Sequence, residues 1–332
     1  MSHRHTVTRL FAAVFAALIL FTAVACNKIP KSTKEESATV LTIDEFAVPY
    51  EQLRYFVCNF RNEHGDVDTW EESEAEAICE EVMEDALSAL RNQYAILSLA
   101  KKYGIERTDK AIEELVNVQI DAAMEDYSST DAYVESLALN HMTASVHRFL
   151  LTVSACNEEL YFAMMEEGAL TSDDEEIRDA VYGDEFVRVK QILIANDPGE
   201  DTDANLEIAK EALGRALDGE DFDELVREYG EDLYMFNNTD GYYICRGVWY
   251  RAFEEAAFGL DIGEVSEIVE TEAGYSILLR CEKDEAYLEA HMDALGEDLR
   301  DAQLSLAIEA RAAEMKLATN ETFASYSVMT ME

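Results

Sequence analysis

Proline is scarce in this sequence, with only Pro30, Pro49 and Pro198 among 332 residues. Because proline removes a backbone N–H and disrupts helix interiors, its scarcity favours long, uninterrupted helices. Hydrophobic residues make up 48% of the chain and aromatic residues 10%, which is enough for a sizeable buried core and excludes global disorder. The length predicts two or three domains.

The sequence also lacks the short motifs of common metal and enzyme sites. None of its six cysteines forms a C-x-x-C pair, which disfavours a zinc site or a dithiol redox centre. It contains no glycine-rich phosphate loop, nucleophile elbow, H-E-x-x-H helix or calcium-binding loop. We therefore predict no metal and no other cofactor, and interpret most of the cysteines as small buried apolar residues.

Basic residues are few, since 26 Lys and Arg stand against 70 Asp and Glu, for a net charge of −44. Such a chain repels nucleic acid and anionic lipid headgroups, so a nucleic-acid partner is excluded. Two interpretations of the acidity remain open. It provides a solvated surface, or it attracts basic client proteins or divalent cations held at a cell envelope.

The first 25 residues have the pattern of a bacterial export signal. Two arginines precede an apolar run over residues 10–21, and small residues lead to Cys26. The apolar run is short for a transmembrane helix. Cleavage before Cys26 followed by its lipidation is our prediction, with residues 26–37 as a polar tether. The alternatives are a secreted protein with a free Cys26 and an uncleaved anchor. All three place the chain outside the cytoplasm.

Residues 38–185 are predicted to form a mainly helical domain. A strand over 38–43 comes first, and Asp44 is expected to cap the helix that follows it. Apolar periodicity and terminal signals then predict a series of helices: 50–61, 71–103, 109–127, 130–139, 143–167 and 173–182.

Residues 186–282 differ in character, because strands and short helices alternate there. The predicted order is a strand, two helices, a strand, a helix and two strands. These elements cover residues 186–194, 204–217, 222–229, 240–244, 253–260, 267–270 and 275–280, and a loop occupies 231–239.

Residues 283–332 return to helix over 283–316, and the tail at 321–329 is a candidate strand. We expect this segment to pack back on residues 38–185, which would make 186–282 an inserted domain. The predicted fold class is therefore α+β. A helical chaperone-like domain would carry an inserted module with a small, mostly antiparallel sheet flanked by helices.

The inserted module resembles the parvulin-type prolyl isomerases over its whole length. The resemblance is carried by segments in matching order and spacing: 187–194, 219–225, 240–247, 253–260, 263–266 and 271–275. With the export signal, the helical flanks and Cys26, the chain as a whole is similar to the PrsA-type foldase lipoproteins. This resemblance implies a peptidyl-prolyl cis-trans isomerase that helps exported proteins to fold.

The resemblance also implies the site residues. Trp249 and Phe253 would form the floor under the substrate proline, with Phe258 beneath them, and Asp232 would lie near the reacting amide. Without the resemblance, Asp232 would be interpreted as a solvated loop acid and the aromatic residues as core or surface. Gln191 and Ser276 stand where the catalytic family members carry two histidines, and neither side chain titrates near neutral pH.

Three functions follow from these observations. The first is an isomerase and foldase at the extracytoplasmic face of the membrane, acting on unfolded exported polypeptides with X-Pro bonds. The second is a non-catalytic holding chaperone that retains a degenerate parvulin-like domain, and the third is an acidic envelope scaffold without clients. The oligomeric state, monomer or homodimer, is left open.

Overall fold

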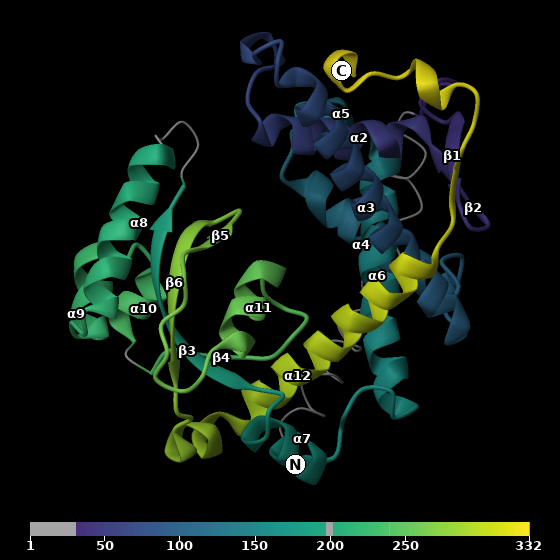
Figure 1. Ribbon diagram of the computed structural model, residues 1–332. Coiled ribbons are helices and arrows are strands. Elements are labelled where there is room, and N and C mark those ends of the chain that lie inside the picture. The colour runs from purple at the N-terminus through teal and green to yellow at the C-terminus, as the bar shows by residue number, and fades with distance from the viewer. Residues whose placement is uncertain (1–30, 197–201, 239, 332) are drawn as a thin grey trace. The chain divides into compact units, whose positions relative to one another are not determined.

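The computed structural model describes residues 31–196, 202–238 and 240–331 (Figure 1). Two compact units divide the chain: unit 1 contains the residues up to Ala163 and those from Ile308 onward, and unit 2 contains Met164–Ala307. The predicted export signal and Cys26 lie outside the described residues. Within the described ranges, no helix combines the length and apolar character that crossing a bilayer requires.

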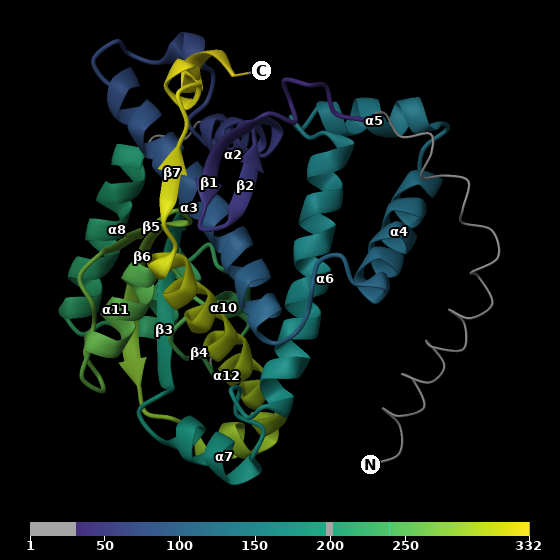
Figure 2. The ribbon, with the colours of Figure 1, turned by 90° about the vertical axis from the view of Figure 1, so that its right-hand side faces the viewer.

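Unit 1 pairs a small sheet with helices. Its strands are β1 (Thr39–Ile43), β2 (Phe46–Pro49) and β7 (Leu317–Thr319), and its helices are α2 (Tyr50–Glu63), α3 (Ala75–Lys102), α4 (Lys110–Glu125), α5 (Thr130–Ala138) and most of α6 (Ala144–Glu166). The sheet order is β2-β1-β7, all antiparallel (Figure 2). Residues near the C-terminus therefore complete a sheet that begins near the N-terminus.

Two predictions for unit 1 were wrong. Asp44 does not cap α2; it lies in the β1–β2 turn at φ 50°, and its carboxylate accepts hydrogen bonds from the Lys316 N–H and from Arg311. These bonds, that from Lys316 first, lower the pKa of Asp44. The predicted strand at 321–329 is replaced by 3-10 turns at Phe323–Ser325 and Val328–Thr330. Arg61 donates to the carbonyls of Val328 and Met331, which satisfies this backbone without a neighbouring strand.

Unit 2 contains the predicted module and the helices at its two ends. Its elements are α7 (Asp174–Tyr182), β3 (Val187–Ala195), α8 (Thr202–Leu217), α9 (Phe222–Tyr229), α10 (Leu233–Asn237), β4 (Tyr242–Ile244), α11 (Arg251–Gly259), β5 (Val269–Thr271), β6 (Gly274–Cys281) and most of α12 (Glu285–Glu314). The strands form an antiparallel sheet in the order β4-β3-β6-β5. The α+β class is confirmed, while the predicted loop at 231–239 was incomplete because it contains α10.

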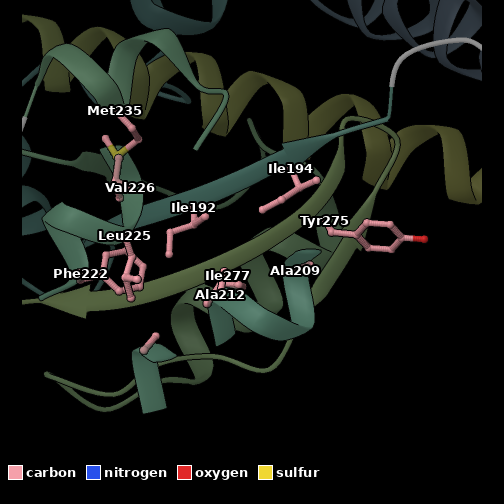
Figure 3. Close-up of a cluster of buried hydrophobic side chains, with 11 residues drawn as sticks. Ile192, Ile194, Ala209, Ala212, Phe222, Leu225, Val226, Met235, Tyr275 and Ile277 are labelled. Carbon is pink, nitrogen blue, oxygen red and sulfur yellow. The ribbon is translucent and has the colours of Figure 1, made fainter. Parts of the chain in front are cut away.

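The two central strands of this sheet bury different side chains on their two faces. Ile192, Ile194 and Ile277 pack against α8 and α9 in the cluster drawn in Figure 3. Val187, Val189 and Leu278 point the other way and pack against α11. Because residues directly opposite each other in a ladder share a face, Gln191, which pairs with Leu278, also faces α11.

A third cluster joins the start of the module to its flanking helices. Phe186 and Tyr243 pack with Leu288, Leu295 and Leu299 of α12, and α7 contributes Ile177 and Val181 to the same cluster. We had expected residues 283–316 to pack on the N-terminal helices. The residues of α12 up to Ala307 instead belong to unit 2, since their apolar stripe covers Phe186 and Tyr243.

Candidate functional site

Asp232 is the centre of a polar network on the α11 side of the sheet. It is the N-cap of α10, and its Oδ1 accepts the N–H groups of Tyr234 at 2.8 Å and Met235 at 3.3 Å. Its Oδ2 accepts Gln191 Nε2 at 2.7 Å and the Tyr242 hydroxyl at 2.8 Å. One carboxylate thus ties β3, β4 and α10 together.

The chain next to Asp232 is also fixed to β3. The Glu231 N–H donates to the Leu193 carbonyl at 2.9 Å, and its carboxylate accepts the Ala195 N–H at 2.6 Å. Burial, and then the hydrogen bond to Asp232 and its negative charge, raises the pKa of Tyr242. The Tyr242 phenol therefore stays a neutral donor. Asp232, with four donors around it, is placed to anchor the site.

Ser276 reaches the same face from β6. It is 2% exposed and lies opposite Leu193, two positions along β6 from Leu278, the partner of Gln191. Such diagonal neighbours lie about 7–8 Å apart. The sheet thus brings Gln191 and Ser276 to one face, where Gln191 contacts Asp232 directly.

Four aromatic residues follow one another beside this network, and we call Tyr234, Tyr242, Trp249 and Phe253 the aromatic row. The Tyr234 and Tyr242 rings stack with centroids 4.7 Å apart, and the Trp249 ring meets Tyr242 at 4.8 Å with its plane tilted by 64°. Trp249 then stacks on Phe253 at 5.1 Å and 17°. Phe253 is 2% exposed, so Trp249 is the more accessible of the two.

Phe258 lies apart from the row, near the end of α11. It is half-buried and packs on the cluster that contains Val187, Phe253 and Leu278. The Arg246 guanidinium lies 4.2 Å from the centroid of the Phe258 ring. The structure therefore brings the two predicted floor residues, Trp249 and Phe253, into contact, and it packs Phe258, predicted to lie beneath them, on the core of the same face.

Glu254 holds the segment that carries Trp249. Its Oε1 accepts three backbone N–H groups, from Gly247 at 2.7 Å, Val248 at 3.0 Å and Trp249 at 2.9 Å, and the residue is 7% exposed. Gly247 has φ 104°, and a Cβ there would come within 2.9 Å of the Ala302 carbonyl oxygen. The turn before α11 therefore depends on this glycine and this carboxylate.

Comparison with known proteins relates the module that carries this site to a family. Residues 191–282 match the PPIC-type PPIASE domain of the rotamases. This segment is therefore similar to the PPIC-type PPIase domains. The chain is also 29% identical over 200 residues to the foldase protein PrsA of Caldanaerobacter subterraneus, covering 59% of this chain and 56% of that protein. PrsA of Halalkalibacterium halodurans is 43% identical over 84 residues, which is 25% of each chain.

Over the 59% of its length that the first match covers, the chain is therefore similar to a PrsA foldase, and the match spans about half of that relative's length. A crystal structure of foldase protein PrsA from Streptococcus pneumoniae is 18% identical to this chain. The structural alignment covers 89% of this chain and 99% of that one, with a TM-score of 0.36.

Two residues of this module were missed by sequence reasoning. Tyr242 is the second donor to Asp232 Oδ2. In the sequence, its position shows only the pattern of a strand residue. Glu254 offered a better signal, because an acidic residue in the first turn of a helix is placed to accept free backbone N–H groups. In the described residues, no group of three or more His, Cys, Asp and Glu side chains gathers as a metal site would require.

Proposed function

We propose that this chain is an extracytoplasmic foldase that isomerises X-Pro bonds in exported polypeptides. The observation that carries the proposal is the Trp249–Phe253 stack beside the Asp232–Gln191–Tyr242 network, inside a module similar to the PPIC-type PPIase domains. An apolar aromatic surface next to fixed polar groups is the arrangement that a proline ring and its preceding amide require.

Isomerisation rotates one C–N bond against a barrier of about 18–20 kcal/mol. The twisted amide has lost its resonance, so an environment with little water and fixed dipoles favours it over the planar amide. In our proposal the proline ring rests on the indole of Trp249, and Phe253 supports the indole from below. The network around Asp232 keeps the neighbouring surface rigid.

The absence of histidine at positions 191 and 276 is compatible with this proposal. Rotation about the amide transfers no proton, so a hydrogen-bonding glutamine and a buried serine suffice as polar neighbours. We therefore expect kcat/KM to change little between about pH 6 and 8, where histidine titrates.

The decisive test is a protease-coupled isomerisation assay of the whole chain on a proline peptide. Trp249→Ala should lower kcat/KM by about tenfold or more, as expected when a ring contact of roughly 1.5 kcal/mol with the twisted substrate is lost. The matched control, Trp70→Ala, changes the other tryptophan of the chain, which lies in unit 1, and should leave the rate unchanged. A wild-type rate equal to the uncatalysed rate would rule out the enzyme.

The export signal and Cys26 support a lipid anchor that holds this foldase at the outer face of the membrane. Expression in a bacterium supplied with labelled fatty acid tests this. We expect label in the wild-type chain and none in Cys26→Ser, and label in neither would leave a secreted protein or an uncleaved anchor.

One observation favours a second candidate, a holding chaperone without catalysis. Trp249 stacks directly on Phe253, so a proline cannot reach that face of Phe253 unless Trp249 moves. If the wild-type chain suppresses aggregation of a denatured client but leaves the isomerisation rate unchanged, this candidate replaces the enzyme.

A further inference from the structure

A cavity of about 320 Å³ lies at the free edge of β4, between β4, α10 and α12 of unit 2. We call it the edge cavity. Four tyrosines and one tryptophan line it together with the imidazole of His291: Tyr234, Tyr242, Tyr243, Tyr287 and Trp249. Three of these belong to the aromatic row, so the edge cavity adjoins the surface on which we place the substrate proline.

The rings that line the edge cavity are held by one another. Tyr243 stacks on Tyr287 with centroids 4.4 Å apart at 5°, and Tyr287 stacks on His291 at 3.9 Å. Burial, and then a hydrogen bond with Tyr234, raises the pKa of Tyr287 to about 12. The Tyr287 ring is therefore neutral at neutral pH, and its stacking contacts hold this wall in a fixed arrangement.

One carboxylate lies at the edge cavity. Asp298 is the acidic residue among the described residues that line it, His291 is the basic one, and neither lysine nor arginine is among them. Arg188 lies 5.7 Å from the Tyr243 ring, but it donates to the carbonyls of Asp240 and Glu282. Burial, and then the charges of Asp301 and Glu297, raises the pKa of Asp298, so a cation beside it would relieve an unfavourable environment.

We propose that the edge cavity binds the side chain of a lysine or arginine in the client polypeptide, close in sequence to the proline that rests on Trp249. The proposal rests on the proposed function, because Trp249 borders both places. Aromatic faces attract a cation through their π electrons, and the carboxylate adds a charge partner. An uncharged apolar side chain would use the rings but leave Asp298 without a counter-charge.

The chain has two tryptophans, Trp70 and Trp249, and this allows a direct fluorescence assay of binding. In a Trp70→Phe background, Trp249 is the sole tryptophan and reports occupancy of the edge cavity by its fluorescence. The probes are alanine-based peptides with one proline and one lysine, with the lysine placed one to three residues before or after the proline. Each peptide is matched by a norleucine and a glutamate version of the same length.

We expect one lysine position to bind about three- to tenfold more tightly than norleucine, and glutamate to bind most weakly. Asp298→Asn should reduce this preference to about twofold or less, since the ring contacts remain. Asp293→Asn, an exposed change on the same helix outside the lining, should preserve it.

Equal binding of lysine and norleucine at every position would overturn the proposal, as would the absence of binding by all of these peptides. The assay also separates this proposal from the proposed function. Lysine preference without isomerisation means that the edge cavity binds cations in a chain that is not an isomerase. Isomerisation without lysine preference means that only the edge cavity proposal fails.

Discussion

The two faces of the β3–β6 ladder have opposite characters although they come from the same residues in alternation. One face carries Ile192, Ile194 and Ile277 against α8 and α9, and the other buried residue of the two strands in this cluster is Tyr275. The α11 face carries Gln191 and Ser276 among its apolar residues. Both polar side chains are buried, which costs free energy unless hydrogen bonds compensate.

This difference shows where the sheet serves stability and where it serves the site. On the aliphatic face, the ammonium of Lys190 is paired with Asp223 of α9 at 2.6 Å. On the α11 face, polar atoms are buried at a cost in free energy. There Asp232 accepts hydrogen bonds from Gln191 and Tyr242, next to Trp249. Substitutions on one face at a time test whether the two faces differ in this way.

The largest effect is expected from the aliphatic face. Ile192→Ala should lower the free energy of unfolding of unit 2 by about 2–5 kcal/mol, because Ile192 is fully buried and its removal leaves a cavity. Ile208→Ala on α8, where the side chain is 41% exposed, is the matched control and should cost well under half of that. Urea unfolding followed by Trp249 fluorescence in a Trp70→Phe background measures both. Equal losses would mean that this face is not the stabilising core.

An intermediate effect is expected at the turn that carries Trp249. Glu254→Ala removes the acceptor of three backbone N–H groups and should cost about 1–3 kcal/mol, with a shift in Trp249 emission. Glu254→Gln keeps an oxygen in place and should cost less. Glu255→Ala, which loses only an exposed pair with Arg251, is the control and should change neither property. Unchanged Trp249 emission in Glu254→Ala would show that the carboxylate does not position the ring.

Sequence reasoning predicted the strands and most helices of the module at residues 186–282, because period-two and helical patterns persist over β3, β6, α8 and α9. It also placed Asp232, Gln191, Trp249 and Phe253 in one module through the family resemblance. It missed α10, since five residues are too few to display a helical period, and so gave Asp232 no capping role. Whether the predicted residues bind a proline stays a prediction.

The end of the chain was harder to predict for a related reason. The apolar stripe of α12 requires a partner, but the spacing of its residues does not reveal which core it covers. The strand β7 has only three residues, and its pairing with β1 depends on a contact across more than 270 positions of sequence. Such contacts are decided by tertiary packing, so local patterns at 321–329 pointed to the wrong residues.

The smallest effect is expected from the hydroxyl that Tyr242 donates to Asp232. Tyr242→Phe keeps the ring and should cost about 1 kcal/mol at pH 8, the usual contribution of one hydrogen bond. It should also reduce the loss of free energy of unfolding as the pH rises above about 10. The pKa of Tyr242 is raised above its usual 10.0, so the folded chain retains a proton that the unfolded chain loses. This contribution is complete below about pH 10 and is lost as the pH rises through the folded pKa.

Denaturant titrations between about pH 8 and 12 measure that slope. Part of it should persist in Tyr242→Phe, because the pKa values of Tyr243 and Tyr287 are also raised by burial. Tyr250→Phe, which alters an exposed ring next to Trp249, should keep the wild-type slope. If Tyr242→Phe has that same slope, its hydroxyl does not stabilise Asp232, and the polar network would then depend on Gln191 and the α10 backbone alone.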